Sequence, residues 1–210
     1  MENKSIFDFD KTLIRINSFP FWILFLMFYS LLKFRFYLFV KLFKLLWNRK
    51  IHENIKHVDF KHELVKLTQN MDCHSQFGII LSLFIRKKVG QKLVELHASG
   101  HRIAVTSAAP EIYLKPFVEK IFPDFEIQIF GSKINENEVW EENFGANKLN
   151  SAIRSRFLEK KEKFRNLFTD SWDDSELAGM AEKITLVYPK NVDKKRFLEN
   201  PELKNKVEFF

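Results

Sequence analysis

The chain has 210 residues, 46% apolar and 29% charged, a composition that excludes a disordered protein and allows one core domain with a small insertion. Its only cysteine, Cys73, excludes an intramolecular disulfide and a zinc site built on cysteines. Eight of its basic residues, and no acidic ones, occur between Asp10 and Glu53, so the net charge of +7 predicts a basic face for an anionic partner. Without a helix-turn-helix, zinc-finger or aromatic RNA-binding signature, we expect an anionic membrane rather than nucleic acid as that partner.

The predicted elements alternate between strands and helices. Residues 5–9 form a short strand, residues 86–99 a helix that Gly100 ends, and residues 101–106 a buried strand. The later elements are a helix at 111–120, a strand at 125–130, a hairpin over 133–140, a helix at 146–157, a strand at 166–169, a helix from 173 and a strand at 184–187. This alternation predicts an α/β fold, a Rossmann-like three-layer core with a parallel sheet. The polar tail after Asp193 is predicted to be loosely ordered.

A long apolar segment without strand signals interrupts this order. We expect a helical cap over residues 14–83, inserted into a core made of residues 1–13 and 84–210. Its uninterrupted apolar run, Phe19 to Leu32, is shorter than the ~20 residues that a membrane-spanning helix needs. From Lys33 onward the pattern is amphipathic, with one polar stripe formed by Lys33, Tyr37, Lys41, Lys44 and Asn48. Two interpretations remain open: an ordinary cap packed on the core, or a cap that also lies in a membrane interface.

Two carboxylates follow the first strand directly. Alternate residues of a strand point to the same side, so Asp8 and Asp10 can serve one site. They lie where ligands bind in open α/β sheets, at the carboxyl end of a strand. Two close carboxylates need a cation or a shared proton, and Mg²⁺ prefers carboxylate and phosphate oxygens. Alone, the pair could equally be a solvated turn.

Three later segments place further polar residues near strand ends or helix starts. Ser107 follows the strand that ends at Thr106, Lys148 lies near a predicted helix start, and Asp170 and Asp174 follow the strand 166–169. Taken singly, these residues fit a helix cap, a surface lysine and a capping cluster.

Together and in this order, the four segments resemble the motifs of the haloacid dehalogenase superfamily of phosphatases, over about residues 5–189. The resemblance implies that Asp8 is the nucleophile and that Asp10 is the general acid and base. It also implies two further sets of residues. The phosphate-binding set is Thr12, Ser107, Ala108 and Lys148, and the Mg²⁺-binding set is Asp8, Asp10 (through its backbone carbonyl), Asp170 and Asp174.

Two details bear on the branch of the superfamily. Lys11 follows Asp10, as in the phosphoserine phosphatase-like branch, subfamily IB. Ser107 is followed by Ala108 and Ala109, where phosphoserine phosphatase has glycines, which weakens the case for phosphoserine. A long, apolar, basic cap resembles the bacterial phosphatidylglycerophosphate phosphatase branch.

The resemblance implies a Mg²⁺-dependent phosphomonoester hydrolase that acts through an aspartyl-phosphate. The first substrate expected is a membrane lipid phosphate such as phosphatidylglycerophosphate. The alternatives are a small soluble phosphomonoester, such as phosphoserine or a phosphorylated amino alcohol, and a non-catalytic lipid-binding module. The start MENKSIFDFD lacks the basic and apolar parts of a secretory signal, so we expect a cytoplasmic protein, at the inner face of the membrane if the cap contacts lipid.

Overall fold

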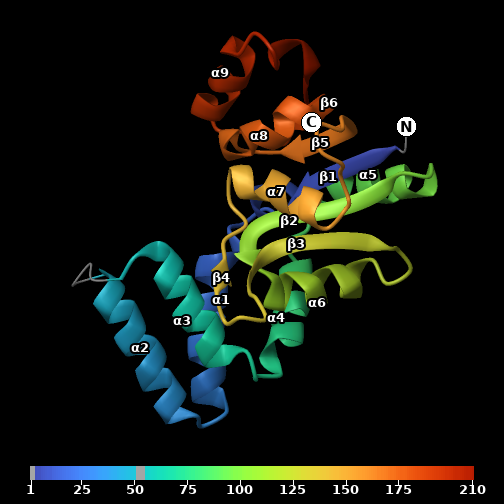
Figure 1. Ribbon diagram of the computed structural model, residues 1–210. Coiled ribbons are helices and arrows are strands. Elements are labelled where there is room, and N and C mark those ends of the chain that lie inside the picture. The colour runs from blue at the N-terminus through green and yellow to red at the C-terminus, as the bar shows by residue number, and fades with distance from the viewer. Residues whose placement is uncertain (1–2, 51–54) are drawn as a thin grey trace.

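The computed structural model describes residues 3–50 and 55–210, and its centre is a sheet of seven strands (Figure 1). The strands are β1 (Lys4–Asp8), β2 (Arg102–Pro110), β3 (Ile127–Ile134), β4 (Trp140–Glu141), β5 (Phe164–Thr169), β6 (Ala181–Leu186) and β7 (Val207–Phe209). Their order is β4-β3-β2-β1-β5-β6-β7, and every pair is parallel except β3 with β4. The mostly parallel α/β sheet confirms the predicted fold class.

Helices cover both faces of this sheet. They include α5 (Lys87–Ala98), α6 (Glu111–Ile121), α7 (Ala146–Arg154), α8 (Ser175–Met180) and α9 (Asn191–Glu199). Because strand residues alternate between faces, Ile6 of β1 joins the hydrophobic core on one face and Phe7 the core on the other. The result is the predicted three-layer arrangement, with β1 in the middle of the sheet.

Most local predictions are close to the observed elements. Gly100 has φ +84° just after α5, the left-handed conformation that glycine adopts most easily at a helix end. The hairpin is confirmed, with β3 and β4 antiparallel around a turn in which Asn135 Oδ1 accepts from two backbone N–H groups. The helix predicted over 146–157 ends at Arg154, because the chain reverses at Arg156 (φ +59°) to bury Phe157.

The prediction of a loosely ordered tail is wrong. Helix α9 buries Phe197 against the sheet, and β7 adds a parallel strand beside β6. A short 3₁₀ turn at Lys204–Lys206 joins them, and Leu203 before it is also buried. Two apolar anchors thus order a segment whose composition is otherwise polar.

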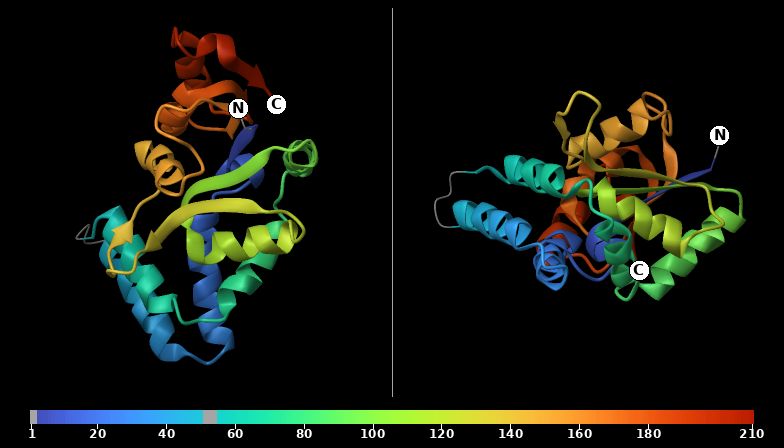
Figure 2. Two further views of the ribbon diagram at one scale, coloured as in Figure 1. Left: turned by 45° about the vertical axis from the view of Figure 1, so that its right-hand side comes forward. Right: turned by 90° about the horizontal axis from the view of Figure 1, so that it is seen from below.

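The segment between β1 and α5 is helical, as predicted. Its helices are α1 (Ser18–Leu32), α2 (Phe36–Lys50), α3 (His57–Thr68) and α4 (Cys73–Ser82). The views agree that α1, α2 and α3 extend beyond the sheet on one side (Figure 2). The division into cap and core at residues 13/14 and 83/84 stays a prediction, since α4 packs on α6 and shares one hydrophobic core with β1. Of the helices in residues 3–50 and 55–210, none has the length and apolar character to cross a membrane.

Candidate active site

The turn after β1 positions two carboxylates at the carboxyl edge of the sheet. Asp8 is the last residue of β1, and Phe9–Leu13 form a tight, irregular turn in which Lys11 has φ +61°. The backbone N–H of Lys11 donates to the carbonyl of Ile16, and the carbonyl of Lys11 accepts from Arg86 Nε at 3.1 Å. These bonds hold Lys11 in its left-handed conformation, with Asp8 just before the turn and Asp10 within it.

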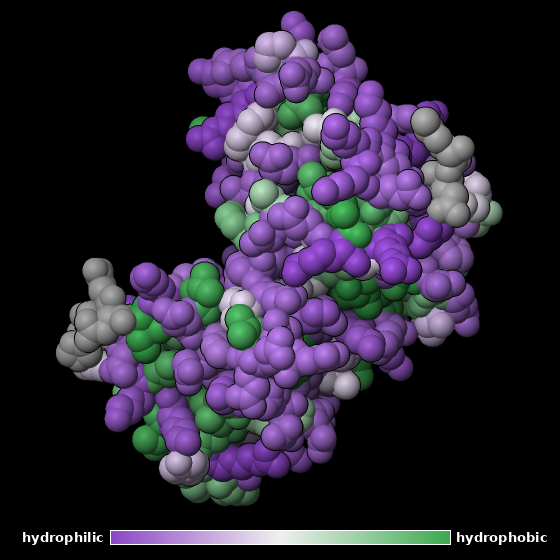
Figure 3. Space-filling model, in the orientation of Figure 1, coloured by the Kyte–Doolittle hydropathy of each residue, from purple (hydrophilic) through white to green (hydrophobic). Residues whose placement is uncertain are grey.

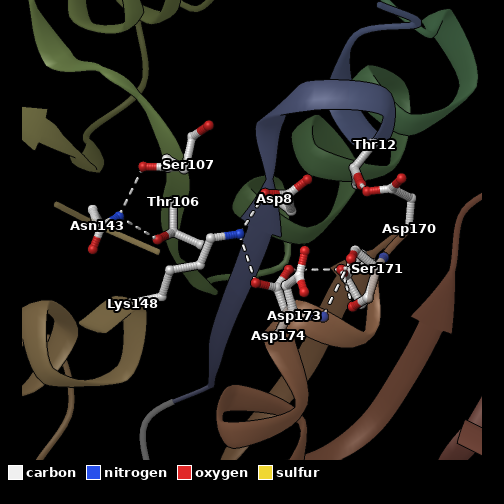
Figure 4. A network of polar contacts seen from close by, with 12 residues as sticks. Asp8, Thr12, Thr106, Ser107, Asn143, Lys148, Asp170, Ser171, Asp173 and Asp174 are labelled. Carbon is white, nitrogen blue, oxygen red and sulfur yellow. Dashed lines mark hydrogen bonds and ion pairs between the residues drawn. The ribbon is translucent and has the colours of Figure 1, made fainter. Parts of the chain in front are cut away.

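A buried lysine lies between two carboxylates at the centre of the site. Lys148 Nζ is 2.7 Å from Asp8 Oδ1 and 2.6 Å from Asp174 Oδ1, and all three side chains are buried (Figure 4). Thr169 at the end of β5 donates to the other oxygen of Asp174, at 2.7 Å. Burial alone would lower the pKa of Lys148, but the carboxylates of Asp174 and Asp8 more than offset this and raise it. Lys148 is therefore a fixed cation in the pocket.

Asp170 is the third buried carboxylate and follows β5. Its Oδ1 accepts from Thr12 Oγ1 at 3.5 Å, the long limit of a hydrogen bond. Burial raises the pKa of Asp170 to about 6. Burial also raises the pKa of Asp8, to about 8. Repulsion from Asp174 and Asp170 adds to this rise, and the attraction of Lys148 opposes it only in part. The cluster holds more negative charge than one lysine neutralises.

Asp10 is positioned differently from Asp8. Its Oδ1 accepts from the backbone N–H of Ser18, the first residue of α1, at 2.8 Å. Burial raises the pKa of Asp10, and the hydrogen bond from Ser18 opposes the shift without reversing it. A carboxyl group with a raised pKa is suited to carry a proton near neutral pH, as a general acid must.

The irregular last part of β2 brings Ser107 and Ala108 to the same edge. The backbone N–H of Ala109 donates to Ser107 Oγ at 3.0 Å, inside the irregular pairing that separates Thr106 from Pro110 along β3. Ser107 and Ala108, at this irregular end of β2, both line the pocket.

Asn143 supports this end of β2 and was not predicted from the sequence. Its buried Nδ2 lies 3.0 Å from Thr106 Oγ1, 3.0 Å from the Ser107 carbonyl and 2.7 Å from the Phe130 carbonyl (Figure 4). One amide therefore joins β2, β3 and the loop between β4 and α7. The sequence carries no signal for this role, because Asn143 does not follow a buried strand of the parallel sheet.

The predicted residues surround one pocket of about 210 Å³. Asp8, Asp10, Ser107, Ala108, Lys148, Asp170 and Asp174 all line it. Thr12 does not, because it is fully buried behind Asp170. Polar residues to which the sequence assigned no role also line it: Lys11, Asn17, Ser171, Asp173, Lys190 and Asp193. A single pocket thus unites residues from four separated segments.

A sequence profile described as haloacid dehalogenase-like hydrolase matches residues 6–178 of the chain. The chain belongs to this family. No curated protein sequence matches the chain significantly. The matched range contains every predicted site residue, from Asp8 to Asp174.

Solved structures show how widely the fold of this hydrolase is shared. A protein of unknown function from Bordetella pertussis Tohama I aligns with TM-score 0.69 and 13% identity over 93% of this chain and 94% of its own. A phosphoserine phosphohydrolase-like protein from Francisella tularensis aligns with TM-score 0.53 and 20% identity over 89% and 87%. Cytosolic 5′-nucleotidase IIIB bound to cytidine aligns with TM-score 0.57 and 10% identity over 99% and 80%. At these identities the likeness concerns the fold.

The acidic residues of this hydrolase fit a magnesium site of few protein ligands. Within the described part of the chain, no group of three or more His, Cys, Asp or Glu side chains is arranged to hold a metal ion. Both oxygens of Asp174 have partners, Lys148 and Thr169, which leaves Asp8 and Asp170 facing the pocket. Mg²⁺ is commonly held by one or two carboxylates together with waters and substrate phosphate, so this pair fits it. The raised pKa values of both carboxyl groups indicate the same need for a cation.

A second, larger cavity of about 630 Å³ adjoins the pocket of this hydrolase. The two share Asp10, Asn17, Ala108 and Phe144. Its apolar lining comes mainly from α1, α2 and α3, and includes Phe19, Pro20, Ile23, Leu46, Val58 and Phe60. Arg49 adds positive charge to the wall, and Lys61 lines it as an ion pair with Glu142. A molecule that reaches Asp8 can therefore extend into a space with apolar and basic walls.

Proposed function

We propose that this hydrolase is a Mg²⁺-dependent phosphatase that cleaves phosphomonoesters through a covalent aspartyl-phosphate on Asp8. The observation that carries the proposal is the row of ion pairs from Asp8 through Lys148 to Asp174, buried beside Asp170 at the carboxyl edge of the sheet. A phosphate group is recognised by fixed positive charge and hydroxyl or amide donors, and the pocket offers Lys148 and Ser107. A protein that only bound a lipid would have no use for this set of carboxylates.

The residues divide the reaction into two steps. In the first, a carboxylate oxygen of Asp8 forms a bond to phosphorus while the bond from phosphorus to the ester oxygen breaks. Asp10 gives its proton to that departing oxygen, a role that its raised pKa favours. In the second step, Asp10, now ionised, takes a proton from water, whose oxygen attacks phosphorus and frees Asp8. Lys148 and Ser107 stabilise charge on the other phosphate oxygens.

Mg²⁺ would be held by Asp8, Asp170 and the backbone carbonyl of Asp10, and when bound it supplies positive charge beside the phosphate. Asp174 has a different part in this proposal from the one expected from the sequence. Because its two oxygens bind Lys148 and Thr169, it positions the lysine rather than the metal.

For the substrate, we propose a phosphomonoester whose alcohol part has an apolar portion, with a membrane lipid phosphate such as phosphatidylglycerophosphate as the first choice. The support is the cavity of about 630 Å³, which begins at Asp10 and continues between apolar walls. Burying an alkyl chain there stabilises the complex by roughly 25 cal/mol for each Å² removed from water. A small soluble phosphomonoester such as phosphoserine is the alternative, since the Arg49 guanidinium also lines the cavity and can pair with a carboxylate.

The catalytic proposal is tested by turnover of an aryl phosphate with Mg²⁺. Asp8→Asn keeps the volume of the side chain but removes the attacking oxygen, so the rate should fall by about 1000-fold or more. Asp124→Asn, an exposed carboxylate after α6, is the matched control and should retain full activity. Near-normal turnover by purified Asp8→Asn would reject the covalent mechanism.

The substrate proposal needs a separate comparison. The purified protein is assayed with short-chain phosphatidylglycerophosphate in detergent micelles, phosphoserine and phosphoethanolamine, at equal concentration. We expect kcat/KM to be highest for the lipid. A higher value for either soluble ester would favour the alternative while leaving the catalytic proposal intact.

A further inference from the structure

The hairpin of α1 and α2 carries an unusually apolar solvent-exposed surface. Its exposed large apolar side chains are Leu24, Phe28, Leu31, Leu32, Phe34, Phe36, Tyr37, Val40, Phe43 and Trp47. In Figure 3, hydrophobic surface lies among hydrophilic side chains over this part of the molecule, at the lower left. Soluble monomers rarely expose so many neighbouring apolar groups unless the surface binds something.

The outward face of α2 is divided into two bands. Phe36, Val40, Phe43 and Trp47 recur at intervals of three or four residues, so they form one apolar band along the helix. The exposed Lys41 and Lys44 lie beside it, and Lys41 Nζ is 4.5 Å from the centre of the Tyr37 ring. The opposite side of α2, around the buried Leu42, packs on the protein.

In the turn between α1 and α2, a phenylalanine has positive φ and is also exposed to solvent. Lys33 ends α1, Phe34 N donates to the Leu31 carbonyl, and Arg35 N donates to the Ser30 carbonyl. This is the helix ending in which glycine is usual at the residue after the cap, because that residue must have positive φ. Here the residue is Phe34, with φ +53° and 79% of its surface exposed. A strained, exposed phenylalanine contributes little to the fold, which indicates that the ring acts outside it.

We propose that the outward face of the α1–α2 hairpin docks on an anionic lipid bilayer. The apolar band and Phe34 would enter the headgroup region, and Lys33, Lys41 and Lys44 would lie among the phosphates. Charge complementarity selects this partner, since the sequence holds eight basic residues and no acidic one between Asp10 and Glu53. The same charges disfavour a second copy of this face, because pairing it with itself would bring lysines against lysines.

Docking is tested by sedimentation of the full chain with vesicles. We expect binding to vesicles of phosphatidylglycerol and phosphatidylcholine, much weaker binding to phosphatidylcholine alone, and loss of binding at high salt. Asp8→Asn should bind as the unmodified chain does, because docking needs no turnover. Failure of the catalytic proposal would therefore leave this result unchanged.

A triple charge variant locates the surface. Replacing Lys33, Lys41 and Lys44 with Gln should weaken binding to anionic vesicles by roughly 10- to 100-fold. The matched control removes three exposed lysines from α5 and α6, through Lys87→Gln, Lys88→Gln and Lys120→Gln, and should change binding much less. Both variants should turn over a soluble aryl phosphate as the unmodified chain does.

Phe34→Gly separates docking from folding. Glycine suits positive φ, so the melting temperature should stay the same or rise, while binding to anionic vesicles should fall several-fold. The proposal is overturned by equal binding of the two triple variants, by equal binding to anionic and neutral vesicles at low salt, or by a dimer in solution that Phe34→Gly dissociates.

Discussion

Asn143 is the residue outside the motifs that supports Ser107 and the neighbouring end of β2. Its buried amide donates to acceptors on Thr106 and Ser107 of β2 and on Phe130 of β3. Asn143→Ala should lower the free energy of unfolding by about 2–4 kcal/mol, because several buried carbonyl and hydroxyl groups lose their donor. Urea unfolding measures this, with the exposed Asn147→Ala as control. A smaller loss of unfolding free energy in Asn143→Ala than in Asn147→Ala would show that water replaces the Asn143 amide.

Asp170 is the residue at which the metal proposal is most directly tested. Asp170→Ala removes one of the two carboxylates proposed to hold Mg²⁺, so half-maximal activity should need at least about tenfold more Mg²⁺. The unmodified chain should lose activity in excess chelator and regain it with Mg²⁺. Mg²⁺ should also raise the melting temperature of the unmodified chain. The rise should be smaller in Asp170→Ala and unchanged in the control Asp124→Ala. Full activity in excess chelator would contradict the proposed metal dependence.

At the scale of elements, the sequence predicts the site residues that lie at the ends of buried strands. It does not predict features that depend on single side-chain contacts. Asp8, Ser107 and Asp170 follow apolar strands, and parallel strands end at one edge, so their meeting could be foreseen. The contact of Lys148 with Asp174 could not be foreseen, because it depends on side-chain packing. The order of the tail was missed because Phe197 and Leu203 are its main anchors and leave no periodic pattern.

The packing of α4 on α6 depends on a glycine. A Cβ at Gly78 would lie 2.9 Å from the backbone N of Phe117, so the two helices would have to separate. Gly78→Ala should therefore cost about 1–3 kcal/mol of unfolding free energy. Gly179 in α8 is the matched control, since a Cβ there would meet no atom within 4 Å. Gly179→Ala should therefore raise the free energy of unfolding by about 0.5–1 kcal/mol. If both substitutions stabilised the protein, the close approach would not be limiting.

At the scale of the whole molecule, one lysine connects the helical segment to the catalytic edge. Lys61 of α3 is buried, and its Nζ donates to the Ala108 carbonyl at 2.9 Å and to Glu142 Oε1 at 2.5 Å. It also lies 5.6 Å from the centre of the Phe19 ring in α1. Since Ala108 lines the pocket that holds Asp8, Lys61 links the wall of the larger cavity to the end of β2 at that pocket.

This link predicts a coupling between stability and catalysis that a double-mutant cycle can measure. Lys61→Met should lower the free energy of unfolding by roughly 2–4 kcal/mol, because it leaves the mostly buried Glu142 without its cation. Glu142→Gln in the same background should recover part of that loss, with a coupling energy of about 1–3 kcal/mol from urea unfolding of the four proteins. Lys61→Met should also raise KM for an aryl phosphate, since the Ala108 carbonyl loses one of its two donors and keeps only Ser132 Oγ, at 3.0 Å, so that the segment can shift. Lys66→Met, at an exposed lysine of the same helix, should change neither the unfolding free energy nor KM. Additive losses in unfolding free energy would show that Lys61 and Glu142 act independently, and an unchanged KM would show that the segment keeps its position without the lysine.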